Sequence, residues 1–247
     1  KLYFMLGLPT ETFDDIEGIA ELSNKIAALF YTIPKERRPG GGRVEIVTST
    51  SFFVPKPFTP FQWVRQNNSE EFLEKQRFLN GKIKEQLNKK SIKYNWDDVG
   101  LTQLEGILAR GDRRLGAVLL DAYHNGCLYD SWSESFKYDM WMKAFEDNQI
   151  NPDFYTARER STDELLPWDF IDAGVSKQFL IREWERAKAG KVTPNCRQSC
   201  SGCGCKVYEG GVCFENKNSF FQGRCDEVYR TLGYGPLFSE GFPPVWH

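Results

Sequence analysis

The sequence contains few of the residues that most hydrolases use for catalysis. Only 2 of its 247 residues are histidines, His124 and His247. Hydrolysis by a serine–histidine or cysteine–histidine pair is therefore disfavoured. His124 follows a leucine-rich helical stretch, where a histidine is more often structural than a general base.

The sequence also lacks a long apolar run and an excess of charge of one sign. No apolar stretch approaches the roughly 20 residues that span a bilayer, and no secretory signal is present, so we expect a cytoplasmic protein without a membrane partner. The 32 basic and 34 acidic side chains nearly cancel. Because no basic stripe stands out, double-stranded nucleic acid is a poor candidate partner.

Cysteine is scarce over most of the chain and then concentrated near its end. Of the 7 cysteines, Cys127 stands alone and the others lie between Cys196 and Cys225. In a small secreted protein this pattern would indicate disulfides. The rest of the chain is typical of a large intracellular α/β enzyme, so we favour metal ligation, with disulfides or free thiols as the alternative.

Strand and helix patterns alternate in the first part of the chain. Residues 2–6 form a continuous apolar run, and residues 44–54 form a second one rich in β-branched side chains. Between them, Thr12 and Asp15 resemble a capping box, followed by apolar residues at helical spacing up to Phe30. Two strands buried on both faces imply a parallel sheet or barrel covered by helices.

The rest of the chain is mainly helical in pattern. We expect a helix that Ser69 caps, a weak strand at residues 92–94, and further helices at residues 101–109, 115–123, 136–145 and 175–189. Composition shifts suggest boundaries near residues 150 and 190, which give segments 1–150, 151–190 and 191–247. Because the chain begins directly in an apolar run, we expect the natural protein to extend upstream.

Two loops that follow the predicted strands are candidate ligand sites. The turn GLPTET occupies residues 7–12, and the aromatic and proline-rich segment around Lys56 occupies residues 52–63. Ligands of α/β proteins bind where parallel strands end, and Lys56 could meet a carboxylate or phosphate. A plain turn and a rigid cover are the structural alternatives.

These segments resemble the radical S-adenosylmethionine (SAM) superfamily. The strand with GLPTET resembles a late strand of that superfamily, and PKPFTPFQW at residues 55–63 is similar to a cobalamin-domain-linked group within it. LEGILARGDRR at residues 104–114, PWDFID at residues 167–172 and the tail from Thr193 are similar to the same group. The resemblance covers most of residues 1–205.

The resemblance implies the C-terminal part of a TIM-type partial barrel, followed by a helical extension and an irregular cysteine-rich tail. It also implies a [4Fe-4S] cluster that cleaves SAM reductively to a 5'-deoxyadenosyl radical. The residues that the resemblance places near SAM are Met5, Gly7, Pro9, Thr50, Ser51, Phe52 and Lys56.

The cluster-binding loop of the superfamily has no counterpart at the expected place in this chain. Cys196, Cys200 and Cys203 have its spacing, but they follow a predicted helix and lie near the end of the chain. We therefore expect Cys196, Cys200, Cys203 and Cys205 to hold a separate zinc ion or auxiliary Fe–S cluster. Similar tails have two residues between the last two thiols, so Cys213 could replace Cys205.

The sequence thus favours a C-terminal fragment of a radical SAM enzyme, inactive alone because its cluster loop is absent. Its partners would be the upstream part of the same protein, which could bind cobalamin, and an RNA or protein substrate. The alternative is a non-catalytic scaffold or interaction module whose tail binds zinc.

Overall fold

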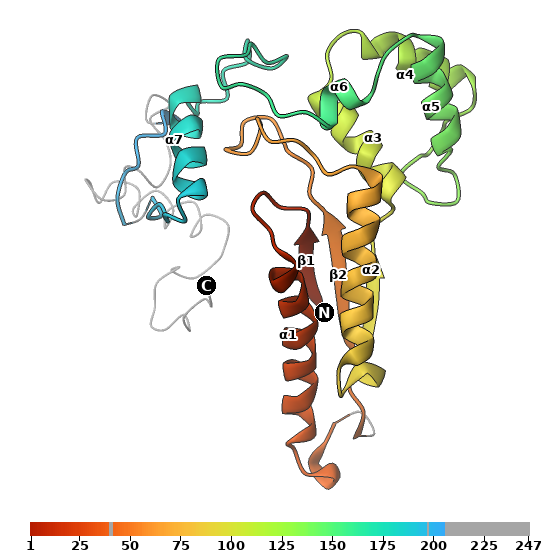
Figure 1. The fold of residues 1–247 in the computed structure, drawn as a ribbon, viewed down its shortest axis with the longest axis vertical. Helices are drawn as coiled ribbons and strands as arrows, with labels where there is room; N and C mark the ends of the chain where they lie inside the picture. The colour runs from red at the N-terminus through yellow and green to blue at the C-terminus, as the bar shows by residue number, and fades with distance from the viewer. Residues whose placement is uncertain (40–41, 197, 206–247) are drawn as a thin grey trace, which may run out of the picture. The chain divides into compact units, whose positions relative to one another are not determined.

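The computed structural model describes residues 1–39, 42–196 and 198–205 (Figure 1). The chain divides into two compact units, Lys1–Ile171 and Asp172–His247. The first unit contains a sheet with two long helices and a group of shorter helices, and the second contains one helix and part of the cysteine-rich tail.

A three-stranded parallel sheet forms the centre of the first unit. Its strands are β1 (Leu2–Leu6), β2 (Ile46–Phe52) and β3 (Ile92–Trp96), in the order β1-β2-β3. Phe4 lies opposite Thr50 in the register, and Thr50 lies opposite Trp96. The crossovers between the strands contain the two long helices, as parallel pairing requires.

Helices α1 (Phe13–Tyr31) and α2 (Ser69–Glu85) cover one face of this sheet (Figure 1). Asn68 caps α2 rather than the predicted Ser69, and both helices begin with a complete capping box. Apolar residues of the sheet and the two helices share one core: Leu6, Ile16, Ile19, Ala20, Phe52, Phe72, Leu79 and Ile83.

No described helix or strand of the first unit covers the opposite face of the sheet. Tyr3 is 74% exposed and Met5 42% exposed, although both lie in the apolar run that forms β1. We define the open face as the side chains that alternate with the helix-covered ones: Tyr3, Met5, Val47, Ser49, Ser51, Lys93 and Asn95. The expectation that both faces of the strands are buried is therefore wrong.

The remaining helices of the first unit pack around a second core. They are α3 (Val99–Arg110), α4 (Leu115–His124), α5 (Tyr138–Asp147) and α6 (Asp153–Thr156). Their shared core consists of Leu104, Ile107, Leu115, Val118, Ala122, Cys127, Trp141, Ala144, Phe145 and Tyr155. Short 3-10 turns at Lys35–Arg37 and Lys89–Ser91 complete the elements of this unit. The predicted helices and the weak strand are confirmed, with boundaries shifted by a few residues.

The second unit contains helix α7 (Lys177–Lys188). The side chain of Ser176 accepts a hydrogen bond from the N–H of Phe179 and caps the helix. Gly190 follows the helix with φ +62°, a left-handed conformation that favours glycine and that confirms the predicted C-terminal stop.

The prediction of a TIM-type partial barrel is wrong for the described residues. They form an open sheet of three strands, in which β1 and β3 each pair with β2 alone. A TIM barrel closes eight parallel strands on themselves. The apolar runs at residues 2–6 and 44–54 identified the strands correctly, but such runs contain no information on curvature or closure.

Among the described residues, no helix combines the length and the apolar character that crossing a membrane requires.

A hydroxyl pair beneath α1 gives a test of the packing between helix and sheet. Ser23 Oγ donates to the Ile19 carbonyl at 2.8 Å and lies 2.9 Å from Thr48 Oγ1, and both side chains are fully buried. Ser23→Ala should lower the free energy of unfolding by about 1–2 kcal/mol, because Thr48 loses its partner. Urea unfolding of Ser23→Ala, Thr48→Val and the double variant measures the coupling, and a strictly additive result would contradict this contact.

Candidate functional site

The turn at residues 7–12 is closed by its own glutamate. The N–H of Gly7 donates to both carboxylate oxygens of Glu11, at 3.0 Å each. Lys75 of α2 forms an ion pair with Glu11 at 2.6 Å, and the two side chains are only 15% and 7% exposed. Glu11 and Lys75 thus fix the turn. Glu11 belongs to the turn that was predicted as a candidate site, whereas no sequence pattern indicated Lys75.

Gly7 is required by both conformation and packing. Its φ is +89°, and a Cβ atom added there would lie 2.6 Å from Cε1 of Phe72. A side chain at this position would be strained and would displace Phe72 from the core. The N–H of Gly7 is already bonded to Glu11, so it is not free to bind a ligand. Gly7 instead permits the tight turn at the carboxyl edge of the sheet.

The residues predicted to contact the cofactor divide between the two faces of the sheet. Met5 and Ser51 lie opposite each other in the register and belong to the open face. Thr50 and Phe52 belong to the helix-covered face, where Thr50 Oγ1 lies 2.9 Å from Tyr94 Oη. Phe52 packs against Phe72, with ring centroids 4.6 Å apart. Met5 and Ser51 therefore share a surface that Thr50 and Phe52 do not reach.

Charged side chains gather where β2 and β3 end. Lys56 forms an ion pair with Glu105 of α3, and both side chains are exposed. Asp97 directly follows β3 and donates its N–H to the Thr50 carbonyl at 3.2 Å. Desolvation, and then the negative charge of Glu105, raise the pKa of Asp97 above its usual value. Pro9 lies half-buried in its turn.

The loop that contains Lys56 is held by a buried polar network. Gln62 Oε1 accepts hydrogen bonds from Trp168 Nε1 at 2.7 Å and from the N–H of Phe58 at 3.1 Å. Arg110, which is fully buried, donates Nη1 to the Val64 carbonyl at 2.6 Å and Nη2 to the Gln62 carbonyl at 3.4 Å. These contacts fix both the side chain and the backbone of Gln62.

A second buried arginine completes the network. The N–H of Arg160 donates to the Trp63 carbonyl at 2.8 Å, and its Nη2 donates to the carbonyls of Arg110 and Tyr155 at 3.3 Å. Its guanidinium lies 5.3 Å from the ring centroid of Trp168. Burial first, and then the charges of Arg160 and Arg158, lower the pKa of Arg110 to about 9, so Arg110 remains charged at neutral pH.

This network joins three segments that are far apart in the sequence. Residues 55–63 contribute Gln62, residues 104–114 contribute Arg110, and residues 167–172 contribute Trp168. Gly106 lies in the second of these segments and packs closely against Gln66, because an added Cβ atom would lie 1.8 Å from Oε1 of Gln66. Gln62, Arg110 and Trp168 therefore orient the loop at the carboxyl edge.

The tail cysteines lie in the second unit. Cys196 and Cys200 are exposed, Cys203 and Cys205 are half-exposed, and all four are free thiols. Burial, a hydrogen bond with Cys203 and the nearby Cys203 and Cys196 raise the pKa of Cys205. In the described part of the chain, no group of three or more His, Cys, Asp or Glu side chains is arranged to hold a metal ion. Cys213, the alternative fourth ligand, lies outside the described residues, and the metal site at the tail cysteines stays a prediction.

The described residues of the first unit define an α/β protein with an open parallel sheet and a carboxyl edge oriented by buried arginines. An uncharacterized protein of Methanocaldococcus jannaschii is similar to this chain, with 35% identity over 119 residues. The match covers 48% of this chain and 22% of that protein, so the chain corresponds to about a fifth of the relative's length. No protein-family model and no solved structure matches the chain.

Removing the Arg110 guanidinium should destabilise the first unit. In Arg110→Met, the carbonyls of Val64 and Gln62 lose a charged donor in a buried site. We expect a loss of about 2–4 kcal/mol in the free energy of unfolding, measured in urea. Arg77→Met on the exposed side of α2 is the matched control, and equal effects of the two substitutions would contradict the structural role of Arg110.

Glu71 should contribute to stability in a defined pH range. Arg65 binds its two carboxylate oxygens at 2.7 and 2.8 Å, and this hydrogen bonding is the main cause that lowers the pKa of Glu71 to about 2. A lowered folded-state pKa stabilises the protein above the unfolded pKa near 4.5, and the effect is lost as the pH falls toward 2. Thermal melts between pH 5 and 2 should therefore show a shallower acid dependence for Glu71→Gln. An unchanged slope would contradict this assignment.

Proposed function

We propose that this chain provides the SAM-binding and substrate side of a radical SAM enzyme. The observation that carries the proposal is the open face of the sheet. The ion pair between Lys56 and Glu105 lies beyond the carboxyl end of β2. Parallel sheets are ordinarily covered on both faces. This face instead combines exposed Tyr3 and Met5 with polar Ser49, Ser51 and Asn95.

The open face and its carboxyl edge are chemically suited to an adenosyl amino acid. The exposed Met5 side chain offers an apolar, polarizable surface for an adenine ring. The ammonium of Lys56 complements a ligand carboxylate, and the carboxylates of Glu105 and Asp97 complement a ligand ammonium. Ligands of α/β proteins commonly bind at the carboxyl ends of parallel strands, which is where these groups lie.

In this proposal, the [4Fe-4S] cluster and any cobalamin belong to other parts of the whole protein. In such an enzyme the cluster supplies the electron for reductive SAM cleavage, and we assign no step of that chemistry to residues 1–247. The activity of the whole protein and an RNA or protein substrate remain part of the proposal. The free state of all five described cysteines supports a reducing compartment such as the cytoplasm.

Methionine methyl groups provide a direct probe of this site. The chain contains 3 methionines, Met5 on the open face and Met140 and Met142 on α5. In ¹³C-methyl NMR spectra of the 247-residue chain, S-adenosylhomocysteine should shift the Met5 resonance and leave the other two unchanged. Lys56→Met should weaken the dissociation constant by about tenfold, because a charge-assisted hydrogen bond is lost.

The control is Lys25→Met, since Lys25 lies on α1 and its side chain is 70% exposed. It should bind S-adenosylhomocysteine as the unmodified chain does. No Met5 shift at millimolar ligand, or equal shifts of all three methyl groups, would refute the proposed site.

A further inference from the structure

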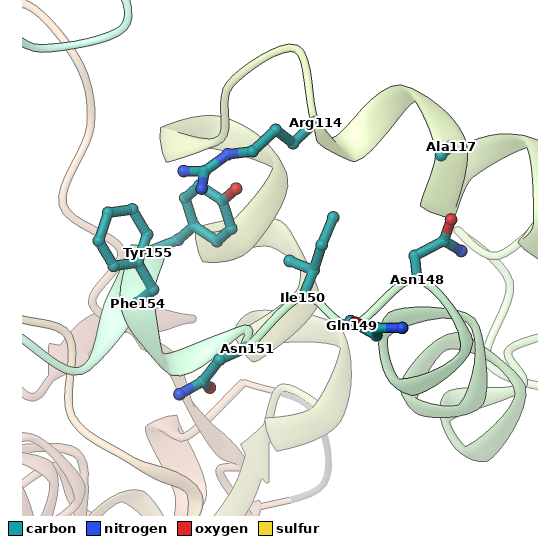
Figure 2. Close-up of a pocket in the computed structure, with 8 residues that line it drawn as sticks. All are labelled: Arg114, Ala117, Asn148, Gln149, Ile150, Asn151, Phe154 and Tyr155. Carbon is teal, nitrogen blue, oxygen red and sulfur yellow. The ribbon is translucent and has the colours of Figure 1, made fainter.

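Two hollows lie on either side of Arg114 in the helical part of the first unit. The first has a volume of about 680 Å³ and lies between the start of α4, the connection after α5, and α6 (Figure 2). Ala117 and Ile150 provide its apolar surface, and Arg114 and Phe154 line it as well. We call the two hollows together the Arg114 groove.

Aromatic rings and guanidinium groups stack in the first hollow. The Arg114 guanidinium lies 5.2 Å from the ring centroid of Phe154 and 5.8 Å from that of Tyr155. Arg158 lies 4.5 Å from the ring centroid of Phe154. Phe154 nevertheless remains 44% exposed, so part of its ring is accessible to a ligand. Figure 2 shows Arg114 extending toward the two rings.

The second hollow also combines an aromatic ring with arginine side chains. It also has a volume of about 680 Å³, and its lining includes Arg113, Arg114, Pro167 and Phe170. Phe170 is 86% exposed, so both faces of its ring are largely accessible. Each hollow therefore presents an exposed aromatic ring beside a cation, and Arg114 borders both.

The charges of the Arg114 groove favour an anionic ligand. Asp112 is the only carboxylate that lines either hollow, and Arg114 binds it through Nε and Nη2 at distances down to 2.6 Å. Nη1 of Arg114 takes no part in these bonds. The Arg113 side chain has no hydrogen-bond or ion-pair partner in the described parts of the chain. The Arg113 guanidinium therefore remains available for phosphate oxygens, and the Arg114 guanidinium, which is paired with Asp112, lies beside it.

We propose that the Arg114 groove binds a single strand of nucleic acid. Single strands are bound by cationic grooves with exposed aromatic rings, on which successive bases stack regardless of sequence. Phe154 and Phe170 would stack the bases, and Arg113 and Arg114 would bind the intervening phosphates. This inference does not depend on SAM binding by the open face.

Fluorescence anisotropy with the 247-residue chain tests this proposal. The probes are fluorescein-labelled octanucleotides of mixed sequence, one of RNA and one of DNA, with a 12-base-pair duplex and polyglutamate for comparison. We expect at least one single strand to bind at least tenfold more tightly than the duplex and polyglutamate. A tenfold preference between RNA and DNA identifies the natural strand. Equal binding shows that the groove recognises bases and phosphates and does not distinguish the two sugars.

Matched variants test the residues of the groove. Phe170→Leu and Phe154→Leu should each weaken binding about five- to tenfold, because leucine offers no π-face. Tyr129→Leu, a control at an aromatic side chain that is 78% exposed and lines neither hollow, should change nothing. Arg113→Gln should lower the slope of log K against log salt by about 0.7, whereas Arg77→Gln should leave it unchanged.

Because Phe170 is almost fully exposed, its substitution does not threaten the fold, and circular dichroism checks each variant. Absence of single-strand binding at 100 µM chain, tighter binding of the duplex or of polyglutamate, or equal loss in Phe170→Leu and Tyr129→Leu would each overturn the proposal.

Discussion

The hydrogen bonds from the buried Arg110 guanidinium to two backbone carbonyls are the interaction on which the carboxyl edge of the sheet depends. A buried charge is costly unless it is hydrogen-bonded, and here two nitrogens of the planar arginine fork donate to the carbonyls of Val64 and Gln62. Trp168 and Arg160 add contacts to the same loop. Arg110, Arg160 and Trp168 therefore hold the loop that places Lys56 beside Glu105.

Local signals allowed much of the secondary structure to be predicted. The capping box at Thr12 and Asp15 marks α1 because its hydrogen bonds join residues that are three positions apart. The exposure of Tyr3 and Met5 could not be predicted, because an apolar run does not reveal which face another element covers. For the same reason the expected barrel was wrong.

The candidate site was predictable only in part. Lys56 stood out as a cation between prolines after a predicted strand, whereas Met5 and Ser51 were proposed only through the resemblance to a known family. Arg110 was quoted only as part of a similar segment, since its partners are carbonyls 46 and 48 residues away and any residue type supplies a carbonyl. The pKa of Asp97 is raised by desolvation and then by the charge of Glu105, and no pattern at residue 97 indicates either cause.

The buried network adjoins both proposed binding surfaces. Arg110 holds the loop that contains Lys56, and the residues that directly follow Arg110 line the Arg114 groove. Hydrogen exchange measured by mass spectrometry tests the central claim that Arg110 orients the loop at the carboxyl edge. In Arg110→Met, residues 53–66 should lose protection strongly while α1 exchanges as before. Unchanged exchange of residues 53–66, or equal loss of protection in α1, would contradict the account.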